Sequence, residues 1–223
     1  MLPTRLPASF SRSPVMRAIA VAVSIGLVSG CATTTTPLDP PRLVYDRTDC
    51  AAAPDLMNAV SLTPRSERAY FYVSRAVDHA TPCWTPDTQA APYIVFEIPA
   101  AFADKTLIVG GGMEPHRIFA ARIMTLDAEG APVREFAAED FFFRQGLYSV
   151  QFRPREWERY ILVTSDRDLV GQTYSSIHIG VNSGATYAAG TYVSYNIGID
   201  ESADRVFSHT GTVSVIVQDG QVD

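Results

Sequence analysis

Lysine, cysteine and long apolar runs are all scarce in this 223-residue sequence. Lys105 is the single lysine, and every other basic residue apart from histidine is an arginine. The apolar run over residues 18–28, AIAVAVSIGLV, has eleven residues. A membrane-spanning helix needs about 20 residues, so this run is too short to predict one.

Recognisable catalytic motifs are also missing. The histidines form no HExxH or other close pair, and no GK[ST] follows the triplet Gly110–Gly112. Residues 180–184, GVNSG, lack the GxSxG spacing of a nucleophile elbow. The sequence therefore predicts no catalytic residue, no metal site and no cofactor. The glycine triplet instead predicts a β-bulge or a loop with unusual backbone angles. The histidines are His79, His116, His178 and His209.

Residues 1–30 have the features of a secretory signal. Three arginines precede the apolar run, and no acidic residue occurs before Asp39. A positive region, a short apolar region and small residues at the end are typical of an export signal. Met16-Arg17 is a complete positive region by itself, so translation from Met16 rather than Met1 is an alternative.

The segment Val28-Ser29-Gly30-Cys31 resembles the bacterial lipobox. In that family the signal peptidase cuts before a cysteine whose sulfur carries a diacylglycerol. The resemblance implies a lipoprotein acylated on Cys31, with palmitate a typical chain. Ala32 resembles the residue that follows the cysteine in outer-membrane lipoproteins, which implies an anchor in the outer membrane facing the periplasm. An ordinary secretory signal with an incidental cysteine is the alternative.

Removal of residues 1–30 would leave an acidic chain. Fifteen basic residues would face 24 acidic ones, a formal charge of −9. Such a charge argues against nucleic acid or an anionic lipid surface as a partner.

Cys50 and Cys83 would be the two cysteines left for pairing. In an exported chain they predict a disulfide, closing a loop of 33 residues. Two free buried thiols are the alternative. Metal binding is disfavoured because no CxxC or nearby histidine pair accompanies them.

The segments before the β-rich part differ in character. Residues 31–43 are rich in threonine and proline and predict an extended tether, roughly 35–40 Å long. Residues 44–83 predict an N-terminal segment with one short α-helix over about 64–79. Thr63 can cap this helix, and Pro64 fits its first position. Apolar residues at spacings of three and four would form its buried face: Ala69, Val73, Ala76, Val77 and Ala80.

Short runs rich in Ile, Val, Tyr and Phe follow from Tyr93 onward. A hairpin turn is predicted at Asp127–Gly130, with Gly130 at positive φ. No helical segment separates the runs, so residues 84–223 predict an antiparallel β-sandwich, Ig-like or jelly-roll-like. For residues 180–211 the sequence is compatible with either strands or an ordered loop. The predicted strands are 93–98, 106–110, 117–126, 133–136, 147–152, 159–165 and 212–218.

Aromatic and acidic residues supply the candidate binding groups. In a strand, Phe141 and Phe143 would share one face and Phe142 the other. We expect both faces to be covered, with an exposed stacking aromatic as the alternative. Weak candidates for ligand binding are Trp157, Tyr187, Tyr192 and Tyr195, with Trp84 weaker still. The carboxylates Glu135, Glu139 and Asp140 predict a solvated face.

The order of several segments resembles the maltose operon periplasmic protein (MalM) family over about residues 84–217. The segments that carry this resemblance are Cys83–Pro86, Phe96–Pro99, Ile118–Ala120, Ile123–Asp127, Tyr160–Ser165 with Asp168-Leu169, Tyr187–Gly190, Ile199-Asp200 and His209–Gly211. The resemblance implies an exported envelope protein linked to carbohydrate uptake, with no catalytic residues to carry over. It also implies that residues 180–211 could be an ordered connection. The lipobox and the lack of a long helical tail depart from the family and put a maltose-specific role in doubt.

Together these features predict a non-catalytic outer-membrane lipoprotein that acts as an accessory or binding module. Its expected partners are the membrane, through the lipid on Cys31, and a carbohydrate or an envelope protein. A carbohydrate-active hydrolase would instead need two facing carboxylates in a cleft beside aromatics. A purely structural envelope component would instead need an exposed apolar patch without a pocket.

Overall fold

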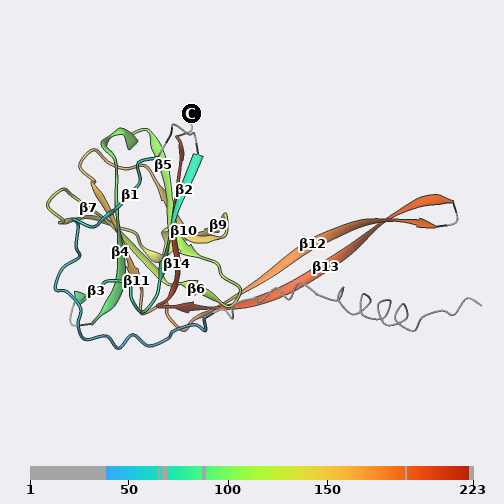
Figure 1. The fold of residues 1–223 in the computed structure, drawn as a ribbon, viewed down its shortest axis with the longest axis horizontal. Coiled ribbons are helices and arrows are strands. Elements are labelled where there is room, and N and C mark those ends of the chain that lie inside the picture. The colour runs from blue at the N-terminus through green and yellow to red at the C-terminus, as the bar shows by residue number, and fades with distance from the viewer. Residues whose placement is uncertain (1–38, 65, 67–69, 87–88, 189, 221–223) are drawn as a thin grey trace, which may run out of the picture. The chain divides into compact units, whose positions relative to one another are not determined.

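The computed structural model describes residues 39–64, 66, 70–86, 89–188 and 190–220. Within the two longest strands, the description of residues 176–182, 188 and 195–202 is limited to the backbone. The predicted signal peptide and the lipidation site Cys31 lie outside the described residues. Within the described residues, no helix is long and apolar enough to cross a membrane. The fold is mainly β, as the sequence predicts (Figure 1).

One sheet is built around the central strands β4 and β11. Its order is β1-β4-β11-β7-β8, and β3 pairs with the free part of β4. The β1–β4 pair is parallel, and the other pairs are antiparallel. The strands are β1 (Val60–Ser61), β3 (Cys83–Trp84), β4 (Ala91–Glu97), β7 (Ala121–Leu126), β8 (Pro132–Glu135) and β11 (Tyr160–Ser165).

The second sheet has the order β2-β14-β5-β10-β9, and all of its pairs are antiparallel. It contains both early and late parts of the chain, because β2 pairs along its length with β14. The 3-10 turns η2 (Ala100–Phe102) and η3 (Ala138–Asp140) precede β5 and β9. The strands are β2 (Tyr70–Val77), β5 (Lys105–Gly112), β9 (Phe142–Arg144), β10 (Leu147–Phe152) and β14 (Gly211–Asp219).

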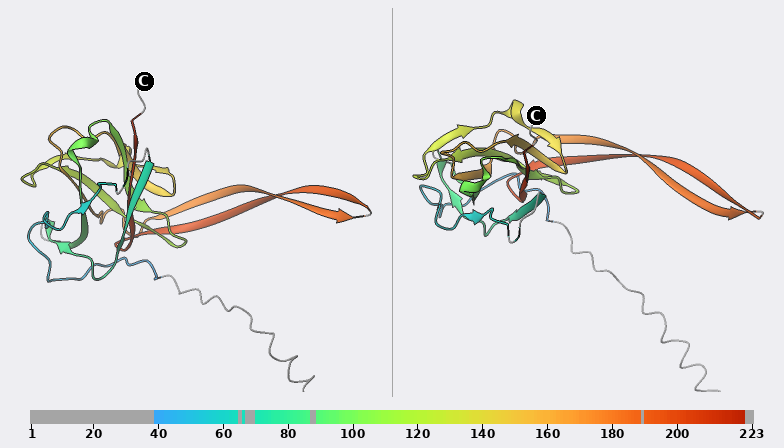
Figure 2. Two further views of the ribbon diagram at one scale, coloured as in Figure 1. Left: turned by 45° about the horizontal axis from the view of Figure 1, so that its top comes forward. Right: turned by 90° about the horizontal axis from the view of Figure 1, so that it is seen from above.

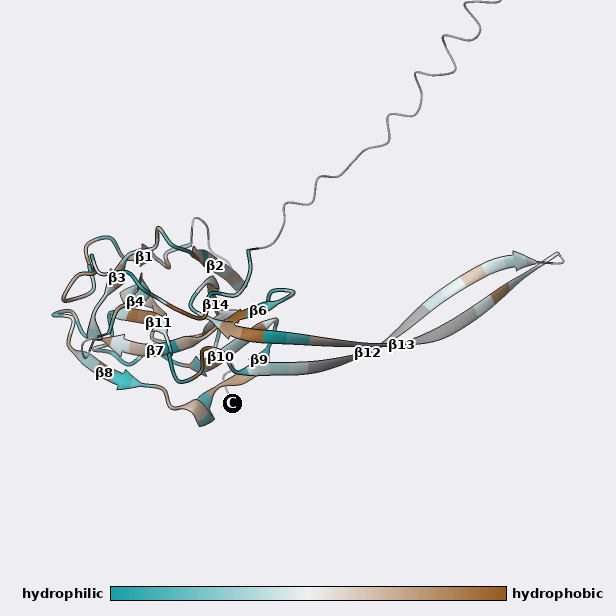
Figure 3. Cartoon of the chain, turned by 90° about the horizontal axis from the view of Figure 1, so that it is seen from below, coloured by the Kyte–Doolittle hydropathy of each residue, from teal (hydrophilic) through white to brown (hydrophobic). Residues whose placement is uncertain are grey.

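Side chains from both sheets meet in one core. Alternate residues of the longer strands point into it, as the period of two requires. Phe96 from β4, Ile123 from β7 and Val109 from β5 are completely buried there. By contrast, β8 is a short, largely hydrophilic strand at the edge of its sheet (Figure 3). The two sheets therefore share a single hydrophobic core.

A long hairpin, β12 (Thr173–Ala188) and β13 (Thr191–Ser208), forms the third sheet with β6 (Arg117–Phe119). β12 and β13 pair from Thr173↔Val206 to Ala188↔Thr191, and β13 pairs in parallel with β6 at Val206–Ser208. The hairpin extends away from the strands of the two larger sheets (Figures 1 and 2). We call residues 173–208 the arm. Of the two alternatives left open for residues 180–211, the structure has strands.

The predicted helix over 64–79 is wrong, because residues 70–77 form strand β2. Tyr70 and Tyr72 are exposed, whereas Phe71 and Val73 pack against the core. This alternation is a strand period. It is hidden in the sequence because both its inward and its outward residues are aromatic. Pairing with β14 then overrides the helical spacing of the alanines and valines.

The prediction of a bulge or irregular loop at Gly110–Gly112 is also wrong. All three glycines lie in β5, in regular register with β10. A Cβ at Gly110 would overlap the carbonyl oxygen of Tyr148, and one at Gly111 would overlap that of Phe119. These glycines therefore allow neighbouring backbone to approach closely. The turn prediction at Asp127–Gly130 is confirmed, since Gly130 has φ +87° and the Asp127 amide donates to the Ala131 carbonyl.

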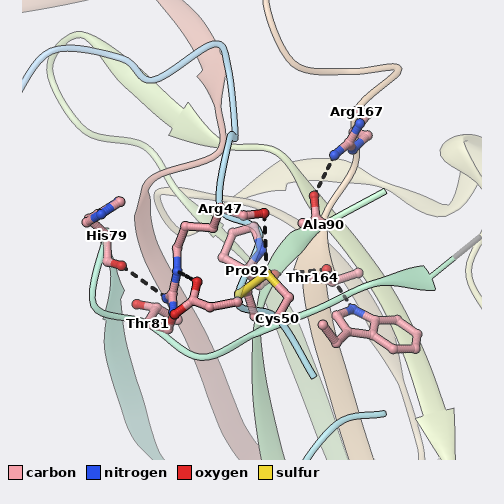
Figure 4. The surroundings of a disulfide bond; sticks show 11 residues. Arg47, Cys50, His79, Thr81, Ala90, Pro92, Thr164 and Arg167 are labelled. Carbon is pink, nitrogen blue, oxygen red and sulfur yellow. Dashed lines mark hydrogen bonds and ion pairs between the residues drawn. A yellow bond between two sulfur atoms is a disulfide. The ribbon is translucent and has the colours of Figure 1, made fainter. Parts of the chain in front are cut away.

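The predicted disulfide between Cys50 and Cys83 is present, with the Cα atoms 4.8 Å apart (Figure 4). It attaches the irregular N-terminal segment to β3. Arg47 reinforces this attachment by donating to the carbonyls of His79 and Thr81. Further upstream, the Arg42 carbonyl accepts the His209 amide at 2.9 Å, and the Arg42 amide donates to Ser208 Oγ at 2.8 Å. The end of the predicted tether is thus bonded to the connection between β13 and β14.

Candidate ligand-binding groove

A groove of about 360 Å³ lies where β7, β8 and β10 meet the loop after β11. Its lining includes aromatic residues, which we call the aromatic wall, and charged residues, which we call the charged wall. Its principal lining residues are Arg122, Glu135, Phe141, Tyr148, Asp166 and Asp168. Concave sites with convergent polar groups and an apolar wall are the usual form of small-molecule sites. We call this cavity the aromatic groove.

Phe141 and Tyr148 form the aromatic wall. Their rings are stacked, with centroids 5.0 Å apart. Phe143 also packs on Tyr148, at 4.9 Å, whereas Phe142 is 57% exposed beneath the Arg144 guanidinium. The predicted alternation of the Phe triplet is confirmed. The expectation that both faces are covered is wrong, because the strand β9 lies at a sheet edge and leaves Phe142 exposed.

The same aromatic cluster holds the root of the arm. Phe143 stacks on Tyr174 of β12 with centroids 3.7 Å apart, and Tyr148 meets Phe207 of β13 edge-on at 5.1 Å. Tyr148 therefore contributes both to the groove and to the attachment of the arm. Burial raises the pKa of its phenol, and the nearby Asp166 carboxylate adds to this effect. The phenol stays protonated at neutral pH and can donate a hydrogen bond.

The charged wall combines one cation with three carboxylates. Arg122 and Glu135 form an ion pair at 2.5 Å across β7 and β8. Asp166 is fixed by its own backbone, because its amide donates to the Ala120 carbonyl and its carboxylate accepts the Asp168 amide. The groove thus offers both donors and acceptors to a polar ligand.

A smaller cavity of about 220 Å³ shares Arg122, Asp166 and Asp168 with the aromatic groove. Thr164 and Ser165 lie on its floor. Trp84 donates from Nε1 to Thr164 Oγ1 at 3.4 Å, so one tryptophan contacts this floor. The two cavities border the same charged residues.

A buried hydrogen bond joins Ser165 to His209 behind this floor. Ser165 Oγ and His209 Nδ1 are 2.8 Å apart, and both residues are almost fully buried. Burial lowers the pKa of His209, and the positive charge of Arg167 contributes in the same direction, so that the pKa is about 4. The imidazole is therefore neutral at pH 7. No sequence motif indicates this pair, because the two residues are 44 positions apart.

A second buried group that sequence reasoning missed is Glu158. It is 1% exposed, and its carboxylate accepts from Thr125 Oγ1, the Arg134 guanidinium and the Arg155 amide. Arg134 in turn lies over the rings of Phe136 and Phe152. Each carboxylate oxygen has a partner, so the group fits a structural role.

The weak binding candidates from the sequence do not converge on the groove. Trp157 is exposed in the connection between β10 and β11. Tyr187 and Tyr192 come together at the tip of the arm, with ring centroids 4.9 Å apart. Tyr195 lies in β13 opposite Gly184, and its side chain is outside the described part.

The acidic candidates are solvated, as predicted. Glu135, Glu139 and Asp140 are all exposed, and of these Glu135 also lines the aromatic groove. The one cluster of potential metal ligands in the described part of the chain is Asp49, Cys50 and Cys83, and the disulfide occupies both sulfurs.

Comparisons with protein-family models, curated proteins and solved structures found no match. The resemblance to the MalM family therefore stays a prediction.

Proposed function

We propose that this chain is a non-catalytic lipoprotein of the outer membrane that binds carbohydrate on its periplasmic side. In this proposal the two larger sheets form a β-sandwich of Ig-like or jelly-roll-like type, and Cys31 carries the lipid. The MalM-like role in carbohydrate uptake belongs to the same proposal.

The observation that carries the proposal is the aromatic groove. Sugars present apolar C–H faces and many hydroxyl groups. Phe141 offers a ring for stacking, and large aromatic side chains lose little conformational entropy on binding. Arg122 can donate to hydroxyl oxygens, while Asp166 and Asp168 can accept from hydroxyl protons. A neutral polyhydroxyl ligand matches this mixed set better than an ion of either sign.

The test is calorimetric titration of the purified full chain with maltodextrins and with peptidoglycan fragments. Asp168 is exposed, and within the described residues its side chain forms no hydrogen bond, so Asp168→Ala should leave the fold intact. We expect this variant to weaken glycan binding about tenfold, the value of one charge-assisted hydrogen bond. Glu129→Ala, an exposed acid in the β7–β8 turn, is the matched control and should bind normally.

Two results would count against the groove. Absence of binding at millimolar glycan would favour a structural envelope role or a protein partner. Binding that is lost in Trp157→Ala but kept in Asp168→Ala would move the site to the β10–β11 connection.

A carbohydrate-active hydrolase is the second candidate, favoured by the carboxylates that share the groove with Phe141. Glycosidases use one carboxyl group as the acid and another as the base or nucleophile. Release of reducing ends from a glycan, abolished in both Glu135→Gln and Asp166→Asn, would establish this reading in place of the non-catalytic one.

A further inference from the structure

The arm is an extended ribbon with little support from the rest of the chain. Sixteen residue pairs join β12 to β13, a length of roughly 50 Å at about 3.3 Å per residue. In the described part of the chain, no other strand pairs with β12, and β13 pairs with β6 only at its last three residues. Two-stranded ribbons are marginally stable in water, whereas sheets of three or more strands are stable. The arm would therefore be stabilised by pairing with strands of another molecule.

The edge of β12 lacks the protection that edge strands usually carry. Natural edge strands are guarded by charged residues, proline or bulges. β8 follows this rule, with Pro132, Arg134 and Glu135 in four residues. β12 contains no Asp, Glu, Lys, Arg or Pro in sixteen residues. β13, by contrast, carries four charged residues near the root: Asp200, Glu201, Asp204 and Arg205.

The tip of the arm carries three exposed aromatic or apolar side chains. Tyr187 and Tyr192 are 63% and 78% exposed although their rings touch each other, and Val193 is 46% exposed. Exposed apolar clusters on projecting elements are typical of contact surfaces. The open edge of β12 leads directly to this cluster.

We propose that the arm is a dimerisation element, in which β12 pairs antiparallel with β12 of a second copy of this chain. Antiparallel pairing of one strand with itself is self-complementary and closes with twofold symmetry. The two ribbons would form a four-stranded sheet with β12 at its centre. The charge distribution fits a second copy as the occupant. The full chain is acidic, with a formal charge of −6, but β12 carries no Asp, Glu, Lys or Arg, so two copies can pair along this strand without placing like charges opposite each other.

The test measures the mass of the purified full chain by light scattering and sedimentation over a concentration series. We expect a dimer that dissociates on dilution. Val181 lies near the middle of β12, so Val181→Lys would bring two identical charges close to the twofold axis. We expect this variant to raise the dimer dissociation constant at least about tenfold. The matched control is Ile197→Lys, which adds the same charge to β13 opposite Asn182 and should dimerise nearly normally.

A shortened arm keeps the test decisive if the charged variant misfolds. Replacing residues 177–202 with Asn-Gly would join the pair Ser176↔Ala203 by a two-residue turn and leave the root in place. This protein should be a folded monomer by near-ultraviolet circular dichroism and sedimentation. A monomeric wild type, or a dimer that survives both Val181→Lys and the shortened arm, would overturn the proposal. Arm-dependent binding of a monomer to zwitterionic vesicles, or to another protein, would overturn it in favour of that occupant.

Discussion

At the scale of single residues, Glu158 combines a full charge with almost complete burial. Neighbouring groups hydrogen-bond to both of its carboxylate oxygens. Removing the charge should therefore destabilise the fold more than a surface substitution does. We expect Glu158→Gln to lower the free energy of unfolding by about 3 kcal/mol, because Arg134 would lose its ionic partner in a partly buried position. Urea unfolding measures this. Glu156→Gln, two residues away and exposed, is the control and should change stability by less than about 0.5 kcal/mol.

His209 should make stability depend on pH. Its pKa is about 4 in the folded state, below the ordinary value of 6.5. Below pH 6.5 the unfolded chain therefore binds a proton that the folded chain does not, and the folded state loses relative stability as the pH falls towards 4. The loss approaches about 3 kcal/mol near pH 4, and none of it is present well above pH 6.5.

The measurement is urea unfolding at pH 7.5 and pH 4.5 for the wild type and for His209→Asn. Asn can bond to Ser165 but does not titrate, so the variant should lose less stability on acidification. Carboxylates titrate in both proteins and cancel in the comparison. Equal losses in the two proteins would show that His209 is not the acid-sensitive group.

At the scale of elements, the disulfide joins the irregular N-terminal segment to β3. We expect Cys83→Ala to lower the free energy of unfolding by about 2–5 kcal/mol. Without the bond, the unfolded chain regains the conformational entropy that closing a loop of 33 residues had removed. Denaturant unfolding without reductant measures the loss. The double variant Cys50→Ala, Cys83→Ala controls for the unpaired thiol and should lose a similar amount. Two reactive thiols in denatured, non-reduced wild-type protein would contradict the bond itself.

Strands with a clear period were predictable from the sequence, and strands with an ambiguous one were not. Residues 93–98 and 147–152 combine β-branched and aromatic residues with turns on both sides, so their assignment needed no tertiary information. β2 was missed because its outward tyrosines resemble core residues. The sequence of the arm is compatible with both strands and an ordered loop, because its glycines weaken the strand pattern. Long-range pairing decides between the two.

The groove depends on contacts that no local pattern encodes. Glu135 is a candidate carboxylate in the sequence, but its neighbours in the groove, Arg122 and Asp166, come from β7 and from the loop after β11. The Phe triplet was a visible signal, and Phe141 is indeed part of the groove. The stacking of Phe143 on Tyr174 was not predictable, because it depends on where the arm leaves the two large sheets.

At the scale of the whole molecule, the attachment to the membrane is the main prediction. Cys31→Ser should abolish labelling by radioactive palmitate and release the protein from the membrane fraction, because no thiol remains to accept the diacylglycerol. Fractionation followed by immunoblotting measures this. The control is Ser29→Ala, because we expect the lipobox to accept a small residue such as alanine at this position. This variant should still be labelled and membrane-bound. Unchanged labelling and fractionation of Cys31→Ser would exclude the lipoprotein assignment.

The bonds between Arg42 and the β13–β14 connection have a mechanical consequence. A pull on the N-terminal side of the chain reaches the folded strands first at Arg42, whose carbonyl and amide are held by His209 and Ser208. Force would thus enter at the base of the arm instead of peeling β1 or β2 from a sheet edge. Tension from the N-terminal side and force on the arm would both act on the hydrogen bonds of Arg42 with Ser208 and His209. Stretching the protein from its N-terminus in an optical trap should therefore break these bonds before any sheet opens.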